Sequence, residues 1–505
     1  MRLSKKNKTL KILFVASEAS PFVKVGGLGE VMYSLPKALR ELGHDVRVMI
    51  PKYSTIDSAK FSMSMIEESL FVPIGENAGG PEGHMICNVK KFLDPDNGQA
   101  VTYLLENEEY YEQRGSVYGY DNDPTRWALL SRGALEFIRV NNEWRPDVIV
   151  SSEWQGGLIP NYIKTVYKDD PVLSKIATVF SIHNLYFQGM FDHRFISEMD
   201  YDDGQSEIRP IGDPLMSKMN FMRRGIRYAD IINTVSPNYA REITTPEYGE
   251  LLDTLLQERR SHLFGILNGI NYDAYNPETD SHISFKYNAK NLKERYKNKE
   301  ILRKKFNLPD GNDKFIIGMV GRLYEQKGFD ILMEVIEPML NNIDFEMVIV
   351  GAGDSKYMSF LSELEKKYPN IKAHLSFDAI LARLIFAGAD ALLMPSKFEP
   401  CGLSQMEAMR YGAVPIVRKT GGLADSVEDY DPLKQTGTGF VFEKFDKYAL
   451  FGTLIRAIET YKYPKLWEGI QKRAMSANFS WSASAKEYAE IFKKAIDFNL
   501  QSKKI

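Results

Sequence analysis

Short apolar runs alternate with amphipathic segments along almost the whole chain. An apolar run of about 4–8 residues is typical of a strand buried on both faces, and helical periodicity after it is typical of a crossover helix. This alternation predicts the α/β class, with parallel sheets covered by helices. The expected strands are Ile12–Ala16, Val46–Ile50, Val148–Ser151, Ala177–Ser181 and Ile231–Val235 in the first half, and Phe315–Val320, Glu346–Val350, Ala391–Met394 and Ala413–Val417 in the second.

Length predicts the number of domains. The 505 residues exceed what one ordinary hydrophobic core accommodates, so we expect two large domains. We place them at residues 1–265 and 266–480, joined near Asn268–Asn271. The charged segment Lys286–Lys305 is predicted to form a solvated helix, because glutamates are interspersed among its basic residues. Residues 481–505 are predicted to form a final helix whose apolar face needs a surface to pack on.

Composition argues against several classes of protein. The formal net charge of −3 argues against dedicated nucleic-acid binding and against a strongly charged membrane partner. Two cysteines, Cys87 and Cys401, are too few for a disulfide framework, which fits a reducing cytosol. No stretch approaches the ~18 apolar residues of a transmembrane helix. We expect a cytoplasmic protein, or one of the plastid stroma if a transit peptide has been removed.

A carboxylate, Glu399, stands in the turn Phe398–Leu403 between a buried strand and a helix. Ligands of parallel α/β sheets bind at this edge, where helix N-terminal amides can also donate hydrogen bonds. A carboxylate here can hold sugar hydroxyls or stabilise an oxocarbenium-like transition state. The alternative is a structural carboxylate that interacts with the helix dipole, which is worth about 0.3–1 kcal/mol.

A glycine-rich turn, Lys24–Glu30, follows the first strand and opens a helix. Its glycines allow backbone amides to approach an anion, and Lys24 can add a positive charge. The motif is neither a Walker A loop nor G-x-G-x-x-G. A plain βα turn explains it about as well.

Three further features lie where strands end. Arg322 and Lys327 flank a loop after the first strand of the second domain, and two cations there suit a diphosphate. His183 follows another strand and can donate to a sugar hydroxyl. The turn Thr420–Asp425 offers amides for a phosphate or sugar. The alternatives are solvated surface cations and a structural histidine. Metal-ligand spacings are lacking, so neither metal nor cofactor is expected.

An ordered set of motifs resembles the bacterial and plant glycogen and starch synthases. The matching segments are Lys24–Gly29, Ser181–Leu185, Leu267–Ile270, Gly321–Leu323 with Gln326–Gly328, Pro395–Leu403 and Arg418–Asp425. The resemblance implies a GT-B fold, two Rossmann-like domains facing across a deep interdomain cleft. It also implies a retaining transfer of glucose from ADP-glucose to the non-reducing end of an α-1,4-glucan, in glycogen biosynthesis.

The same resemblance implies roles for individual residues. Glu399, His183, Lys327 and Arg322 would be catalytic, with Arg322 and Lys327 neutralising the departing ADP. The donor-binding residues would be Lys24, Gly26, Gly27, Asn184, Asn268, Phe377, Cys401, Gly402, Leu403, Gly421 and Gly422. Within this set, the Gly26 and Gly27 amides would meet the diphosphate, and Phe377 would stack on adenine. The final helix would cross back onto the first domain.

Two positions depart from the family pattern. Glu153, before Trp154, stands where the family usually has Asp, and so does Glu30. Each change adds a methylene, and misplacement of about 1 Å in a tight site can cost ~10²-fold in rate. We therefore assign Glu153, Trp154 and Glu30 to the acceptor side. UDP-glucose as donor, a different acceptor, and a weakly catalytic glucan-binding relative are the alternatives.

Overall fold

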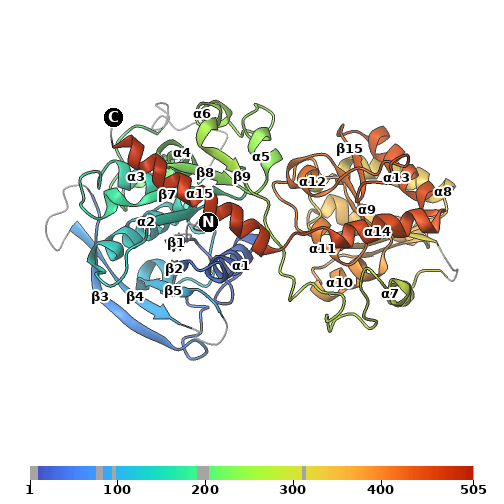
Figure 1. The fold of residues 1–505 in the computed structure, drawn as a ribbon, viewed down its shortest axis with the longest axis horizontal. Coiled ribbons are helices and arrows are strands. Elements are labelled where there is room, and N and C mark those ends of the chain that lie inside the picture. The colour runs from blue at the N-terminus through green and yellow to red at the C-terminus, as the bar shows by residue number, and fades with distance from the viewer. Residues whose placement is uncertain (1–8, 76–82, 94–97, 190–203, 310–313, 504–505) are drawn as a thin grey trace, which may run out of the picture. The chain divides into compact units, whose positions relative to one another are not determined.

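The computed structural model describes residues 9–75, 83–93, 98–189, 204–309 and 314–503. The chain divides into two compact units (Figure 1). Unit 1 comprises residues 1–235, 240–266 and 481–505, and unit 2 comprises residues 236–239 and 267–480. The last helix, α15 (Trp481–Ser502), therefore belongs to unit 1.

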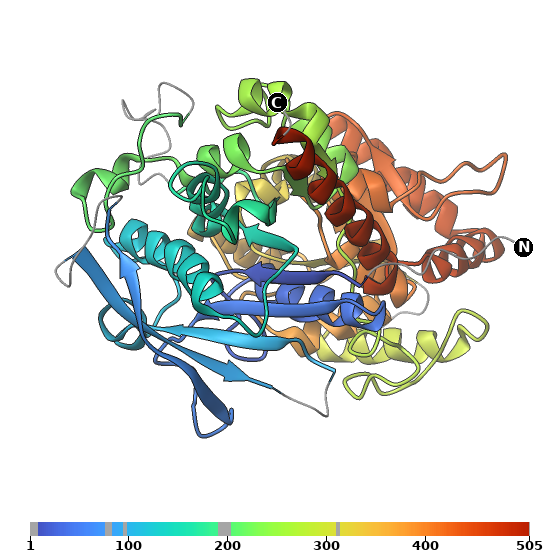
Figure 2. The same ribbon diagram turned by 60° about the vertical axis from the view of Figure 1, so that its left-hand side comes forward.

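Unit 1 is built on one sheet with the strand order β3-β4-β5-β2-β1-β6-β7-β8-β9. β1 pairs in parallel with both β2 and β6, so the chain reverses its winding direction at β1. β3 and β4 form a long antiparallel ribbon at one edge (Figure 2). The strands are β1 (Lys11–Val15), β2 (Asp45–Pro51), β3 (Met63–Pro73), β4 (His84–Phe92), β5 (Val101–Glu106), β6 (Val148–Ser152), β7 (Ala177–Ile182), β8 (Ile231–Thr234) and β9 (Leu263–Gly265).

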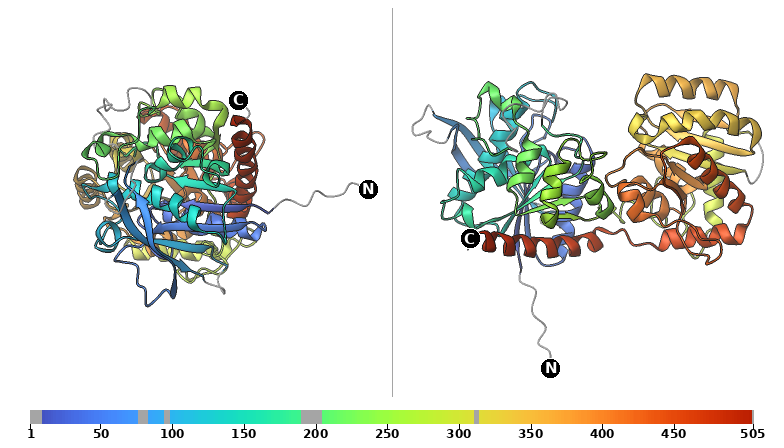
Figure 3. Two further views of the ribbon diagram at one scale, coloured as in Figure 1. Left: turned by 90° about the vertical axis from the view of Figure 1, so that its left-hand side faces the viewer. Right: turned by 90° about the horizontal axis from the view of Figure 1, so that it is seen from above.

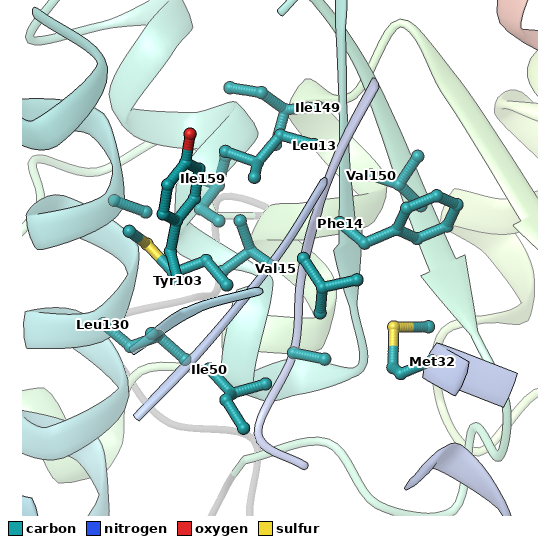
Figure 4. Packing of buried hydrophobic residues seen from close by; sticks show 14 of the residues in the cluster. Leu13, Phe14, Val15, Met32, Ile50, Tyr103, Leu130, Ile149, Val150 and Ile159 are labelled. Carbon is teal, nitrogen blue, oxygen red and sulfur yellow. The ribbon is translucent and has the colours of Figure 1, made fainter. Parts of the chain in front are cut away.

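Helices cover both faces of this sheet because the side chains of β1 alternate between two apolar layers. Phe14 points to one face (Figure 4). The centroid of its ring lies 6.2 Å from that of Phe492 of α15. Leu13 and Val15 point to the other face. Figure 3 shows α15 running alongside unit 1. The other helices are α1 (Gly27–Glu41), α2 (Asp123–Val140), α3 (Leu158–Lys164), α4 (Phe221–Tyr228), α5 (Pro237–Glu242), which spans the division between the units, and α6 (Asp253–Glu258).

Unit 2 contains a parallel sheet with the order β12-β11-β10-β13-β14-β15. Its first strand, β10, again lies between two neighbours, β11 and β13. Ile317 and Ile316 belong to different apolar clusters, one on each face. The strands are β10 (Phe315–Val320), β11 (Phe345–Val350), β12 (Ile371–His374), β13 (Ala391–Met394), β14 (Val414–Arg418) and β15 (Phe440–Phe442), and the helices are α7 (Lys293–Lys305), α8 (Phe329–Asn342), α9 (Ser355–Lys367), α10 (Ala379–Gly388), α11 (Ser404–Arg410), α12 (Gly421–Ser426), α13 (Lys447–Tyr461) and α14 (Pro464–Ser476).

The expected strands all form, with ends that differ by a residue or two. Six further strands, β3, β4, β5, β9, β12 and β15, were not predicted. The expectation of a solvated helix at Lys286–Lys305 was wrong for one face of α7. Arg295 is buried and donates to the Tyr411 carbonyl oxygen at 2.9 Å, and Lys299 pairs with buried Asp390 at 2.6 Å. Charge content alone did not reveal that these cations have partners in the fold.

Candidate functional site

Glu399 lies in the turn that connects β13 to α11 of unit 2. Gly402 in this turn has a φ of 66°, a left-handed conformation that glycine adopts without strain. Glu399 Oε2 accepts hydrogen bonds from Lys327 Nζ at 2.5 Å and from Ser396 Oγ at 3.2 Å. The side chain is buried. Glu399 is therefore a paired carboxylate, held at the carboxyl edge of the sheet.

Arg322 and Lys327 come from the loop after β10, the strand beside β13. Lys327 is half-buried and contacts Glu399, whereas Arg322 is exposed. Gly328, with a φ of 78°, lets the loop pack closely on the Glu399 turn, because a Cβ there would lie 1.9 Å from the Pro395 carbonyl oxygen. Unit 2 thus brings two predicted cations and the predicted carboxylate to one sheet edge, at its topological switch point.

Gly421 and Gly422 pack against the backbone of the same turn. A Cβ on Gly421 would lie 1.9 Å from the Glu399 carbonyl oxygen. The Gly422 N–H donates to the carbonyl oxygens of Glu399 and Pro400, each at 3.1 Å. The Gly422 amide therefore already has acceptors within the protein, and its predicted contact with the donor stays a prediction. Both glycines allow two backbone segments to approach closely.

Asn268 contacts Cys401 of this turn. The Cys401 thiol accepts the backbone N–H of Asn268, and burial raises the pKa of the thiol to about 12, so it stays neutral. The Asn268 side chain is also buried, and its Oδ1 has no hydrogen-bond partner among the residues that the structure describes. A buried acceptor without a partner costs about 1–3 kcal/mol. Asn268 Oδ1 is therefore well suited to accept a ligand hydroxyl.

The remaining predicted residues of unit 2 offer unused backbone donors or an exposed side chain. In the described part of the chain, the N–H groups of Cys401, Gly402 and Leu403 donate no hydrogen bond, so they can bind an acceptor oxygen. Phe377 follows β12 at the same sheet edge and is 88% exposed. Its predicted contact with adenine stays a prediction.

Glu18 is a site residue that the sequence analysis missed. It follows β1, is buried, and accepts the N–H of Gly26 on both carboxylate oxygens at 3.2 Å and the N–H of Val25 on Oε2. The Gly26 N–H therefore already has an acceptor within the protein. A diphosphate bound at this amide would lie close to the negative charge of the Glu18 carboxylate. The predicted contact of the Gly26 amide with the donor stays a prediction. A signal was available, a carboxylate directly after a strand and shortly before the glycines.

Lys24 and Glu30 form an ion pair across the glycine-rich turn, with Nζ and Oε2 2.9 Å apart. Glu30 also accepts a hydrogen bond from Ser34 Oγ at 2.9 Å and lies in the first turn of α1, where the helix dipole favours a carboxylate. Lys24 remains half exposed and can still meet an anion. Gly27 begins α1 and is exposed. The structure gives Glu30 a local partner, and its assignment to the acceptor side stays a prediction.

Glu153 joins two neighbouring strands of unit 1. It follows β6, has a φ of 59°, and its Oε1 accepts the N–H groups of His183 at 2.6 Å and Asn184 at 2.8 Å at the end of β7. Burial raises the pKa of Glu153 to about 8, although both amides favour the charged form. The side chain of Glu153 therefore positions the His183 loop directly. Its predicted contact with the acceptor stays a prediction.

His183 is a neutral hydrogen-bonding group in this fold. Burial lowers the pKa of its imidazole to about 4, and Nε2 lies 3.3 Å from Ser181 Oγ. A neutral imidazole can donate to a sugar hydroxyl or accept from one, whereas a cation cannot accept. Asn184 uses Oδ1 to accept the Tyr186 N–H at 3.2 Å. Trp154 is partly buried and lies beside Glu153.

Every helix among the described residues is too short or too polar to span a membrane. Within the same residues, no group of three or more His, Cys, Asp or Glu side chains is arranged to hold a metal ion.

Comparison with known proteins adds to this geometry. Residues 11–258 match the model of the starch synthase catalytic domain, and residues 298–473 match that of group 1 glycosyl transferases. Glycogen synthase from Thermosipho africanus is 41% identical over 494 residues, which cover 97% of this chain and 99% of that protein. Glycogen synthase from Thermotoga maritima is 39% identical over 496 residues, covering 96% and 99%.

A solved structure extends the likeness to the fold. The catalytic domain of starch synthase IV from Arabidopsis thaliana, bound to ADP and acarbose, has a TM-score of 0.81 at 29% identity and covers 97% of this chain and 100% of that chain. This match confirms the predicted GT-B class of two Rossmann-like units. Because the likeness includes both units in sequence and in fold, the chain belongs to the glycogen and starch synthase family and is a glucosyltransferase.

Proposed function

We propose that this protein transfers glucose from ADP-glucose to the non-reducing end of an α-1,4-glucan, with retention of the anomeric configuration. The observation that carries the proposal is the ion pair between Lys327 and Glu399 at the switch point of unit 2. An adenine nucleotide as donor is supported by the related starch synthase, which was solved with ADP.

The two side chains of this ion pair can act on different parts of the donor, Lys327 on the diphosphate and Glu399 on the sugar ring. An ammonium group has three N–H donors, and Lys327 directs one of them at Glu399. The others can bind oxygens of the leaving diphosphate, and the exposed Arg322 adds a bidentate fork. The Glu399 carboxylate can stabilise the positive charge that develops on the sugar ring. With two cations available for the diphosphate, we expect no requirement for a divalent metal.

Neutral hydrogen-bonding groups complete the donor site. Asn268 Oδ1 and the amides of Cys401 to Leu403 in unit 2 are suited to the sugar hydroxyls. In unit 1, the neutral imidazole of His183 is also a group that can bind a sugar hydroxyl. Such groups bind hydroxyls without competing for the charged phosphates. Phe377 offers an exposed ring for adenine.

A donor and acceptor panel tests the proposal. ADP-, UDP- and GDP-glucose are each supplied with glycogen and with maltose, with and without EDTA, and nucleotide release is measured. We expect ADP-glucose with glycogen to be fastest, EDTA to leave the rate unchanged, and the new linkage to show an α-anomeric proton signal. Faster turnover of UDP-glucose or a β-linked product would refute the proposal. Glycogen binding without ADP release would instead identify a weakly catalytic relative.

A further inference from the structure

The loop after β7, residues 183–189 and here called the histidine loop, is anchored at both ends. At its start the Glu153 carboxylate accepts the amides of His183 and Asn184. Near its end the buried Gln188 side chain donates to the Glu250 carbonyl oxygen at 2.6 Å and accepts from Asn220 Nδ2 at 2.7 Å. Buried hydrogen bonds of this kind hold a loop in one conformation.

Two further contacts fix the course of the histidine loop. Gly189 lies against the indole of Trp154, where an added Cβ would approach ring carbon Cε3 to 2.2 Å. Within the loop, Asn184 accepts the N–H of Tyr186 on Oδ1 and the N–H of Phe187 on its carbonyl oxygen, each at 3.2 Å. The segment between the anchors is therefore a hydrogen-bonded turn with a defined orientation.

Two exposed aromatic residues, Tyr186 and Phe187, form the part of this turn that is here called the crest. Tyr186 is 41% exposed and Phe187 is 52% exposed. Their ring centroids are 5.4 Å apart, and the ring planes make an angle of 89°. Leu251, next to the Glu250 anchor, adds a third apolar side chain and is 58% exposed. Apolar side chains that a well-anchored loop holds at the surface mark a binding site more strongly than scattered ones do.

The chemistry of this crest selects its ligand. Two aromatic rings suit a neutral ligand with flat apolar faces, such as a pyranose ring, better than a diphosphate, which binds cations and N–H donors. Perpendicular ring planes cannot both stack on one flat base. They can, however, each meet one sugar of a chain whose successive rings change orientation. The crest follows His183 and Asn184 in the histidine loop, and Gly189 at the end of that loop lies against Trp154, so the loop borders the candidate site of unit 1.

We propose that Tyr186 and Phe187 form an acceptor subsite, on which successive glucose rings of an α-1,4-glucan pack. The proposal rests on the proposed function for the identity of the glucan. It assigns the crest to the acceptor, and the donor to the residues of unit 2 described above.

Alanine variants separate this subsite from the rest of the enzyme. Tyr186→Ala, Phe187→Ala and the double variant are compared with Phe71→Ala, a matched control at a 54% exposed phenylalanine of β3 in the same unit. Rates are measured against maltoheptaose and against the donor. We expect the double variant to raise the KM for maltoheptaose about tenfold, a loss of one stacking contact or more. The KM for ADP-glucose and the kcat at saturating glucan should not change.

Phe187→Leu and Phe187→Trp keep the test decisive if an alanine variant unfolds. Leucine retains apolar volume but removes the flat ring, so it should weaken glucan binding, while tryptophan should preserve it. Migration in native gels that contain glycogen measures glucan affinity without any donor. It therefore distinguishes failure of this subsite from failure of the proposed ADP-glucose reaction.

Three results would overturn the subsite. The first is unchanged glucan affinity in the double variant. The second is an increase in the KM for ADP-glucose with no change for maltoheptaose, which would place the nucleotide on the crest. The third is a change of oligomeric state by size-exclusion chromatography with intact glucan affinity, which would make the crest an interface between copies of the chain.

Discussion

Glu153 makes the stability of unit 1 depend on pH in a direction opposite to that of an ordinary carboxylate. Burial raises the pKa of Glu153 from its ordinary value of 4.5 to about 8. Between these values the folded protein binds a proton that the unfolded chain has already released. The free energy of unfolding therefore falls as pH rises, by about 1.4 kcal/mol per pH unit between roughly pH 5 and pH 8. The total over this range is about 4 kcal/mol.

The variant Glu153→Gln removes this titration and keeps the fold contacts. A glutamine carbonyl oxygen can still accept the amides of His183 and Asn184, which Glu153 Oε1 accepts now. We expect the variant and the wild type to have similar stability near pH 5. At pH 9 the free energy of unfolding of the variant should exceed that of the wild type by about 4 kcal/mol.

Urea unfolding followed by tryptophan fluorescence measures the difference, because four of the five tryptophans, all but Trp467, lie in unit 1. Both proteins are unfolded at several values between pH 5 and pH 9, with Glu68→Gln at an exposed glutamate as the control for the substitution itself. Titrations elsewhere cancel when the two curves are subtracted. Parallel curves would refute the reasoning, and so would a difference that shrinks as pH rises.

Variants at three more residues test the rest of the site. Lys327→Ala should lower kcat/KM about 10²–10³-fold, since it removes a cation aimed at the leaving group; near-wild-type turnover would reject its role. Glu18→Ala should accelerate hydrogen exchange at the Val25 and Gly26 amides, whereas Glu18→Gln, which keeps an acceptor oxygen, should accelerate it less; unchanged exchange in the alanine variant would contradict the hydrogen bonds of Glu18 to these amides. Gly421→Ala should lower the melting temperature measurably, because its Cβ would lie 1.9 Å from the Glu399 carbonyl oxygen; a wild-type melting temperature would show that the turn can yield.

Much of the fold was predictable because its signals are local. Buried parallel strands are short apolar runs, and each expected strand from Ile12–Ala16 to Ala413–Val417 has a counterpart in the structure. The ribbon of β3 and β4 was missed because its exposed face breaks the apolar run that marks a buried strand. The face of α7 was misjudged because Arg295 and Lys299 find buried partners far away in the sequence.

The sequence by itself determined the α/β class, the candidate residues at the strand ends, and the family, because apolar periodicity and ordered motifs are properties of short segments. Only the tertiary structure decided how the candidates are used. It pairs Lys327 with Glu399, which lies 72 positions away in the sequence, and it gives the Gly26 N–H a hydrogen-bond acceptor in Glu18. It also makes Glu153 an anchor of the histidine loop. Hydrogen bonds and burial depend on atoms that meet in space, and their partners are distant along the chain. For this reason no local pattern could assign them.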